Sequence, residues 1–92
     1  MMKQQAFYAQ VHGRVQGVGF RYSAVMEAQK LNLCGWVKNA ANGDVEVWAE
    51  GPAEKLNLFL KWLRRGPQFS AVDSVEKTDV VPRGYSNFGV DY

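Results

Sequence analysis

Glycines and an arginine between residues 12 and 22 form the pattern in this 92-residue chain that is best suited to chemistry. The stretch reads HGRVQGVGFRY, after an alternating apolar run and before a helical pattern, and Gly13, Gly17 and Gly19 are expected in one short loop. Glycine permits positive φ and lets a ligand approach main-chain N–H groups without a Cβ in the way. A helix that begins directly after such a loop adds unpaired N–H donors and the positive end of its dipole. The pattern therefore predicts an anion site, above all for phosphate.

Arg21 strengthens this prediction. A cation in the first turn of a helix stands at the unfavourable end of the dipole, which costs a few tenths of a kcal/mol up to about 1 kcal/mol. An anion between the guanidinium and the helix N-terminus would turn this repulsion into two attractions, and the planar fork of arginine suits phosphate. The alternative is a tight turn with Arg21 directed into solvent, which requires the glycines and the misplaced cation to coincide by chance.

The loop differs from other phosphate-binding motifs. It lacks the Gly-Lys-Ser/Thr ending of a P-loop, and its glycine spacing is not that of dinucleotide-binding sites. Nucleotide binding is therefore disfavoured.

Length and composition indicate one small domain over residues 1–92. Hydrophobic residues make up 47% of the chain and charged residues 22%, which is typical of a globular protein. The formal charge is +2 without a block of like charges, so neither a nucleic-acid tail nor a polybasic membrane patch is predicted. Because Cys34 and His12 are the single cysteine and histidine, no internal disulfide or His/Cys metal site is expected. No signal peptide or membrane span is predicted, and we expect a cytoplasmic protein.

Hydrophobic periodicity predicts the elements that position the loop. Residues 6–12 alternate as a half-buried strand, and residues 20–31 carry a helical apolar stripe. Asn32 tolerates the left-handed conformation that often ends a helix. Strands at 35–39 and 44–50 are joined through Asn42-Gly43, a strong hairpin signal.

A second helix and two more strands complete the predicted fold. The helix is expected to run from Gly51-Pro52, with Pro52 in the first helical position, to Gly66-Pro67. Strands follow at 75–81 and 88–92. The order β-α-β-β-α-β predicts an α+β fold, namely a ferredoxin-like sandwich with both helices packed on one face of an antiparallel sheet.

Three motifs resemble the acylphosphatase family. They are GRVQGVGFRY at 13–22, GWVKN at 35–39 and NGDVE at 42–46, and the resemblance covers nearly the whole chain. Members of that family hydrolyse the carboxyl–phosphate mixed anhydride of acyl phosphates without a metal or cofactor, and they have the ferredoxin-like fold. The resemblance implies the same fold, the same activity and no cofactor for this chain.

The resemblance also implies which residues form the site. The family's phosphate-binding arginine falls on Arg21, and its water-positioning asparagine falls on Asn39. Its phosphate loop, which binds through main-chain N–H groups, falls on Arg14, Val15, Gln16, Gly17, Val18, Gly19 and Phe20. The implied partner is a small-molecule acyl phosphate, with inorganic phosphate as a competitive product inhibitor.

Such a reaction requires little covalent chemistry from the protein. The transition state of phosphoryl transfer is loose, and catalysis rests on positioning and on stabilising oxygen charge. The leaving carboxylate has a conjugate acid with a pKa of roughly 4, so no general acid is required. Arg21 and the loop amides would stabilise charge while Asn39 holds the attacking water, and the family suggests a phosphate oxygen of the substrate as the base.

Several residues have simpler interpretations beside these. Asn39 precedes a hairpin, where asparagine often makes a turn hydrogen bond. His12 adjoins the loop without a Ser, Cys or acidic partner, so we expect a strand-end residue rather than a base. Lys38 is expected on the opposite strand face from Asn39. Packing roles are expected for Trp36, Trp48, Trp62 and, as a small half-buried hydrophobe, Cys34.

Two other functions are compatible with the same fold. An RNA-binding module would use aromatic residues such as Tyr8 and Trp48 on the open sheet face, although Glu46 and Glu50 beside Trp48 would repel phosphates. A non-catalytic domain that binds acyl or carbamoyl phosphate would resemble family members appended to larger enzymes. Arg21 and Asn39 favour turnover over mere binding, so we expect an enzyme. We also expect a monomer without nucleic-acid or membrane partners.

Overall fold

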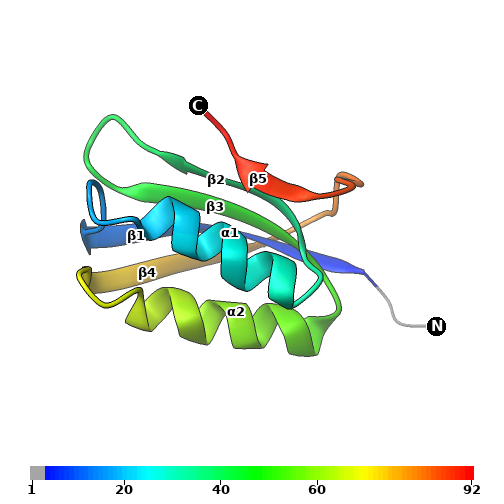
Figure 1. The fold of residues 1–92 in the computed structure, drawn as a ribbon. Coiled ribbons are helices and arrows are strands. Elements are labelled where there is room, and N and C mark those ends of the chain that lie inside the picture. The colour runs from blue at the N-terminus through cyan, green and yellow to red at the C-terminus, as the bar shows by residue number, and fades with distance from the viewer. Residues whose placement is uncertain (1–3) are drawn as a thin grey trace.

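A five-stranded sheet with two helices on one face forms the fold (Figure 1). The computed structural model describes residues 4–92. The elements in chain order are β1 (Gln5–Arg14), α1 (Phe20–Lys30), β2 (Cys34–Asn39), β3 (Val45–Gly51), α2 (Ala53–Arg65), β4 (Ala71–Val80) and β5 (Phe88–Val90). The strand order in the sheet is β4-β1-β3-β2-β5. This arrangement confirms the predicted ferredoxin-like sandwich.

The pairing of β5 corrects one part of the prediction. The β1–β3, β1–β4 and β2–β3 pairs are antiparallel, but β5 runs parallel to β2, so the sheet is mixed. The reason is that residues 81–87 carry the chain from the β4 edge of the sheet to the opposite edge, where β5 arrives in the direction of β2.

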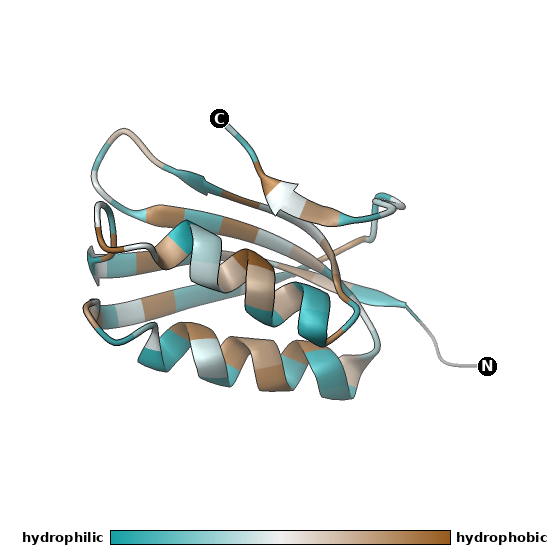
Figure 2. Cartoon of the chain, in the orientation of Figure 1, coloured by the Kyte–Doolittle hydropathy of each residue, from teal (hydrophilic) through white to brown (hydrophobic). Residues whose placement is uncertain are grey.

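The core lies between the helices and the covered face of the sheet. The predicted helical stripes are confirmed, since Phe20, Ala24 and Ala28 of α1 and Leu56, Phe59 and Leu63 of α2 are buried. The Phe59 ring contacts those of Phe7 and Phe88 at centroid distances of 6.4 and 5.7 Å. Apolar residues occur in both helices and along the central strands (Figure 2). Neither helix of residues 4–92 is long and apolar enough to cross a membrane.

The end of β1 differs from the prediction because Gly13 belongs to the strand and not to the loop. The register of β1 against β4 shifts between His12 and Gly13, which marks a bulge. Gly13 has φ +128°, and a Cβ there would lie 2.2 Å from the carbonyl oxygen of Ala71. Glycine is therefore required for the close approach of the two strands, and this pairing extends β4 back to Ala71, four residues before the predicted start at 75.

The other boundaries agree closely with the sequence. α1 ends one residue earlier than predicted, and Asn32 has the predicted positive φ, at 58°. Pro52 is the N-cap residue of α2, with extended backbone, rather than its first helical residue. β5 ends at Val90, two residues before the predicted end.

Candidate active site

A pocket of about 240 Å³ lies where the loop after β1 meets the start of α1. Four segments that are far apart in the sequence meet there: the loop, the first turn of α1, the end of β2 and the C-terminal residues. The lining residues are Val15, Gly17, Gly19, Phe20, Arg21, Tyr22, Asn39, Val90 and Tyr92. The structure thus brings the two predicted catalytic residues, Arg21 and Asn39, to one pocket.

The loop is shorter than predicted and covers residues 15–19. Arg14 is the last residue of β1 and Phe20 is the first of α1. Gly17 and Gly19 have φ of +72° and +76°, a backbone conformation that favours glycine. Gly19 is the N-cap residue of α1 and has no side chain that could accept a hydrogen bond from the first N–H groups of the helix. The first turn also contains no acidic residue. The first N–H groups of α1 are therefore left for an anion.

Arg21 lines the pocket and does not simply extend into solvent. Its guanidinium carbon lies 5.5 Å from the centroid of the Tyr92 ring, within cation–π range. Tyr92 is brought there by β5, because Val90 pairs with Val37 and the N–H of Asp91 donates to the Val37 carbonyl at 2.8 Å.

The sequence interpretation missed Tyr22, Val90 and Tyr92 as lining residues. Alternation in the last strand was visible, but it does not say which strand is the neighbour. The parallel pairing with β2 is what places the end of the chain beside Arg21.

Asn39 has an unsatisfied polar atom. Its Oδ1 is buried and has no hydrogen-bond partner within residues 4–92. Other groups close the hairpin, since the N–H of Ala40 donates to the Asp44 carbonyl at 2.8 Å and the N–H of Asp44 donates to Asn42 Oδ1 at 3.0 Å. A buried unsatisfied acceptor costs about 1–3 kcal/mol, and a catalytic role is one of the explanations for such a group. The structure therefore contradicts the turn-bond interpretation of Asn39.

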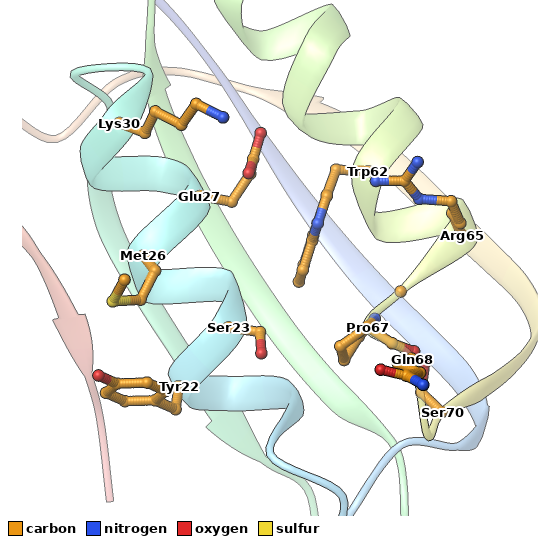
Figure 3. A pocket seen from close by; sticks show the side chains of 11 residues that line it. Tyr22, Ser23, Met26, Glu27, Lys30, Trp62, Arg65, Pro67, Gln68 and Ser70 are labelled. Carbon is orange, nitrogen blue, oxygen red and sulfur yellow. Dashed lines mark hydrogen bonds between the residues drawn. The ribbon is translucent and has the colours of Figure 1, made fainter.

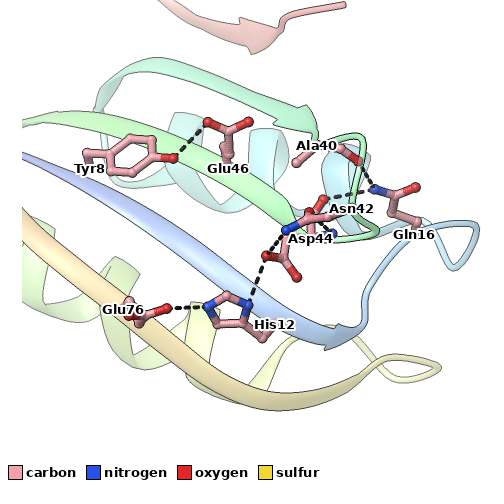
Figure 4. A network of polar contacts seen from close by, with 8 residues as sticks. All are labelled: Tyr8, His12, Gln16, Ala40, Asn42, Asp44, Glu46 and Glu76. Carbon is pink, nitrogen blue, oxygen red and sulfur yellow. Dashed lines mark hydrogen bonds and ion pairs between the residues drawn. The ribbon is translucent and has the colours of Figure 1, made fainter.

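Gln16 joins the loop to the hairpin that follows Asn39. Its Nε2 donates to the carbonyls of Ala40 and Asp44, both at 2.8 Å (Figure 4). Among the other predicted loop residues, Arg14 is exposed, Val18 is half-buried, and neither lines the pocket. The side chain of Gln16 thus holds the backbone of the turn that follows Asn39.

We expect Gln16→Leu to lower kcat about tenfold with a smaller change in KM, because the two lost hydrogen bonds cost about 1–2 kcal/mol and free Asn39 to move relative to the loop. Steady-state kinetics and urea denaturation measure both effects. Gln29→Leu is the matched control, since Gln29 donates a single 3.2 Å bond to the Phe88 carbonyl, away from the loop. Equal kinetic losses in the two variants would contradict this role of Gln16.

His12 has two acidic partners, which corrects the prediction that it stands alone. Its Nδ1 lies 2.9 Å from Asp44 Oδ2, and its Nε2 contacts Glu76 Oε1 (Figure 4). Glu76 lies on β4 and Asp44 lies in the turn between β2 and β3, so the contacts depend on strand pairings that the local sequence does not reveal. Hydrogen bonds to Glu76 and Asp44 raise the pKa of His12. His12 does not line the pocket, and it joins three parts of the sheet.

Stability should therefore depend on the charge of His12. A raised pKa in the folded state gives a stabilisation that is complete below about pH 6.5 and is lost as pH rises through the folded-state pKa. The free energy of unfolding of the wild type minus that of His12→Gln should decrease across this range, as measured by urea denaturation at several pH values. A difference that stays constant or grows with pH would exclude this linkage.

The fold and the pocket define a small α+β sandwich of the ferredoxin-like class with an arginine-containing pocket at its first strand–helix junction. Comparison with known proteins makes the assignment specific. The acylphosphatase family matches residues 7–90, and the chain belongs to this family. An acylphosphatase of Bacillus licheniformis is 49% identical over 84 residues, which are 89% of this chain and 92% of that protein.

Solved structures agree with this assignment. The crystal structure of acylphosphatase from Bacillus subtilis superposes with a TM-score of 0.93 at 43% identity, over 96% of this chain and 99% of that one. Full-length HypF, in a phosphate- and nucleotide-bound form, matches with a TM-score of 0.89 at 27% identity, but the match covers only 12% of that chain. The chain is thus an enzyme that hydrolyses acyl phosphates.

Proposed function

We propose that the pocket at the β1–α1 junction binds the phosphoryl group of the substrate. Arg21 and the main-chain N–H groups of residues 15–20 hold its oxygens, and Asn39 holds the attacking water. The observation that carries this proposal is that Arg21, the start of α1 and Asn39 line one pocket although they lie far apart in the sequence. Asn39 supplies a side-chain amide to this pocket, and this amide would hold the water beside the phosphorus atom.

In the proposed reaction, the water oxygen forms a bond to phosphorus while the bond from phosphorus to the carboxylate oxygen breaks. The negative charge on the phosphoryl oxygens meets the guanidinium and the helix N-terminus, which are already in place and need little reorganisation. The electron pair of the broken bond leaves on the carboxylate, which needs no proton at neutral pH. A phosphoryl oxygen accepts the proton of the water, and the product phosphate occupies the same pocket as a competitive inhibitor.

Asn39→Ala tests the role of the water-binding amide. We expect kcat to fall about 10²–10³-fold, as for loss of one precisely placed transition-state contact, while the inhibition constant of inorganic phosphate changes much less. The free energy of unfolding should not fall, because the removed oxygen makes no hydrogen bond within residues 4–92. Asn57→Ala, on the exposed side of α2, is the matched control. Retained kcat, or an equal loss of phosphate binding, would contradict the assignment.

The open sheet face supports an RNA-binding function less well. Tyr8 and Trp48 do pair across β1 and β3, but Trp48 is only 6% exposed and the Arg83 guanidinium carbon lies 4.1 Å from its ring centroid. The Tyr8 hydroxyl donates to Glu46 at 2.7 Å, and burial together with this contact raises the pKa of Tyr8 to about 12. The Trp48 ring is thus buried and covered by Arg83, and the Tyr8 hydroxyl is already hydrogen-bonded within the protein.

We further propose that the enzyme acts as a monomer in a reducing compartment, which size-exclusion chromatography and thiol titration test. The single cysteine, Cys34, is free and half-buried in β2, as predicted for a structural thiol.

A further inference from the structure

The position of Asn39 depends on the turn that follows it between β2 and β3, and Asp44 is the centre of the hydrogen bonds in this turn. The main-chain carbonyl of Asp44 accepts from the Ala40 N–H and from Gln16 Nε2, both at 2.8 Å. Its N–H donates to Asn42 Oδ1 and its Oδ2 accepts from Asn42 Nδ2, both at 3.0 Å. Asp44 is only 8% exposed. Whatever holds the Asp44 side chain therefore also holds the backbone that follows Asn39.

His12 holds the Asp44 side chain from the face of the sheet away from the helices (Figure 4). In β1, His12 alternates with Val11, which belongs to the core under the helices. Its Nδ1 lies 2.9 Å from Asp44 Oδ2, and its Nε2 contacts Glu76 Oε1 on β4. Asn39 lines the pocket at the start of α1, on the other face. The imidazole thus supports the turn from behind and does not touch the pocket.

The groove between the two helices does not provide such a support. It has a volume of about 810 Å³, and Trp62 forms one wall, while Tyr22 and Met26 lie on the side of α1 away from Trp62 (Figure 3). Neither Asn39 nor Asp44 lines this groove. The side-chain contacts that fix the turn come instead from the phosphate loop and from the open face of the sheet.

We propose that His12 is a positioning residue for the reaction, which holds Asn39 in place through Asp44 and makes kcat depend on the charge of the imidazole. The proposal rests on the proposed role of Asn39 in the phosphate pocket. A protonated imidazole donates from both nitrogens, and hydrogen bonds between charged partners are shorter and stronger than neutral ones. A neutral imidazole has a single N–H for the two carboxylates, and this N–H no longer carries positive charge. The turn is therefore held less firmly when His12 is neutral.

The charged groups around His12 favour its protonated form. Near His12 in the strand register they are Arg14 on β1, Lys38 on β2, Asp44 before β3, Glu46 on β3, and Asp73 and Glu76 on β4. Acidic groups predominate, and hydrogen bonds to Glu76 and Asp44 raise the pKa of His12. The support is therefore complete below about pH 6.5 and is lost as pH rises through the folded-state pKa of His12.

The test measures kcat for benzoyl phosphate between about pH 6 and pH 9 in the wild type and in His12→Gln. At the acidic end, kcat of the variant should be about 3- to 10-fold lower, because Asn39 is less well placed. KM and the inhibition constant of phosphate should not change, since Arg21 and the loop are intact. The ratio of wild-type to variant kcat, in which substrate ionisation cancels, should fall toward 1 as pH rises. A ratio that does not change with pH, or a loss in KM instead of kcat, would overturn the proposal.

Glu76→Gln is the matched control, because it replaces the other carboxylate partner of the same imidazole and leaves the contact with Asp44. Its kcat at about pH 6 should equal that of the wild type. The decline of kcat should begin at lower pH than in the wild type, because a contact that raises the pKa of His12 is weakened. A loss at the acidic end equal to that of His12→Gln would assign the effect to a general loosening of the sheet and overturn the proposal.

A double variant separates this role from the function of Asn39 itself. In Asn39→Ala, the further change His12→Gln should cause no additional loss of kcat, because the group that His12 positions is absent. Losses that multiply in the double variant would overturn the positioning role and leave the pocket assignment intact. A wild-type kcat in Asn39→Ala alone would instead contradict the proposed function, and the positioning role with it.

Discussion

Arg21→Ala should lose about 10³-fold or more in kcat/KM for acetyl phosphate and remain folded. The guanidinium is the positive side chain of the phosphate pocket, and it shares the phosphoryl charge with the N–H groups at the start of α1. Without it, the developing oxygen charge meets only main-chain donors. The inhibition constant of inorganic phosphate should rise as well, because the same contact holds the product.

The stability of Arg21→Ala should move in the opposite direction. A cation in the first turn opposes the helix dipole, so its removal should leave the free energy of unfolding unchanged or raise it by up to about 1 kcal/mol. The substitution also removes the cation–π contact between Arg21 and Tyr92. A combined loss of activity and gain of stability is typical of a residue retained for function.

Three measurements decide this prediction: steady-state hydrolysis, phosphate inhibition and urea denaturation. Arg64→Ala is the matched control, since Arg64 is exposed in the last turn of α2 and lies outside the pocket. Arg21→Lys should recover only part of the activity, because an ammonium group cannot make the paired contacts of a guanidinium. Activity within a fewfold of the wild type in Arg21→Ala would exclude a direct role in phosphate binding.

Local patterns were sufficient for the parts of the molecule that depend on local physics. The stripe of Phe20, Ala24 and Ala28 places α1 on the sheet, and the positive φ of Asn32 ends it as predicted. Gly17, Gly19 and Arg21 indicated a pocket because their conformational freedom and charge act over a few residues. The opposite faces of Lys38 and Asn39 follow from strand alternation, and Lys38 indeed lies over Trp36 while Asn39 lines the pocket.

Contacts between distant segments were not predictable in the same way. The bulge at Gly13 exists because β4 pairs with β1 there, and the acidic partners of His12 come from β4 and from the turn between β2 and β3. Tyr92 reaches Arg21 only because β5 pairs in parallel with β2. Each of these depends on sheet order and register, which hydrophobic periodicity does not determine.

Glu50→Gln should lower the free energy of unfolding by about 3 kcal/mol. Glu50 is 5% exposed, and its carboxylate accepts hydrogen bonds from Trp48 Nε1 and from the N–H groups of Arg83, Gly84 and Tyr85. The glutamine amide would present a donor where the carboxylate presents an acceptor. At least one of these buried donors would then lose its partner.

The same contacts set a pH dependence. Burial raises the pKa of Glu50, but the hydrogen bonds from Arg83, Trp48, Tyr85 and Gly84 outweigh burial and hold the pKa below its ordinary value of about 4.5. A lowered pKa in the folded state gives a stabilisation that is present above this value and is lost as pH falls through the folded-state pKa. The difference in unfolding free energy between wild type and Glu50→Gln should therefore shrink in acid.

Glu46→Gln is the matched control on the same strand, because Glu46 accepts one hydrogen bond, from Tyr8, which a glutamine oxygen can also accept. It should change stability by about 0.5 kcal/mol or less. Equal losses of unfolding free energy in Glu50→Gln and Glu46→Gln would show that the four hydrogen bonds of Glu50 do not add to the stability of the fold. Because residues 83–85 lead into β5, Glu50→Gln should also raise KM modestly by loosening the strand that carries Tyr92 to Arg21. A KM that stays at the wild-type value in Glu50→Gln would show that the hydrogen bonds of Glu50 to residues 83–85 do not affect the position of Tyr92.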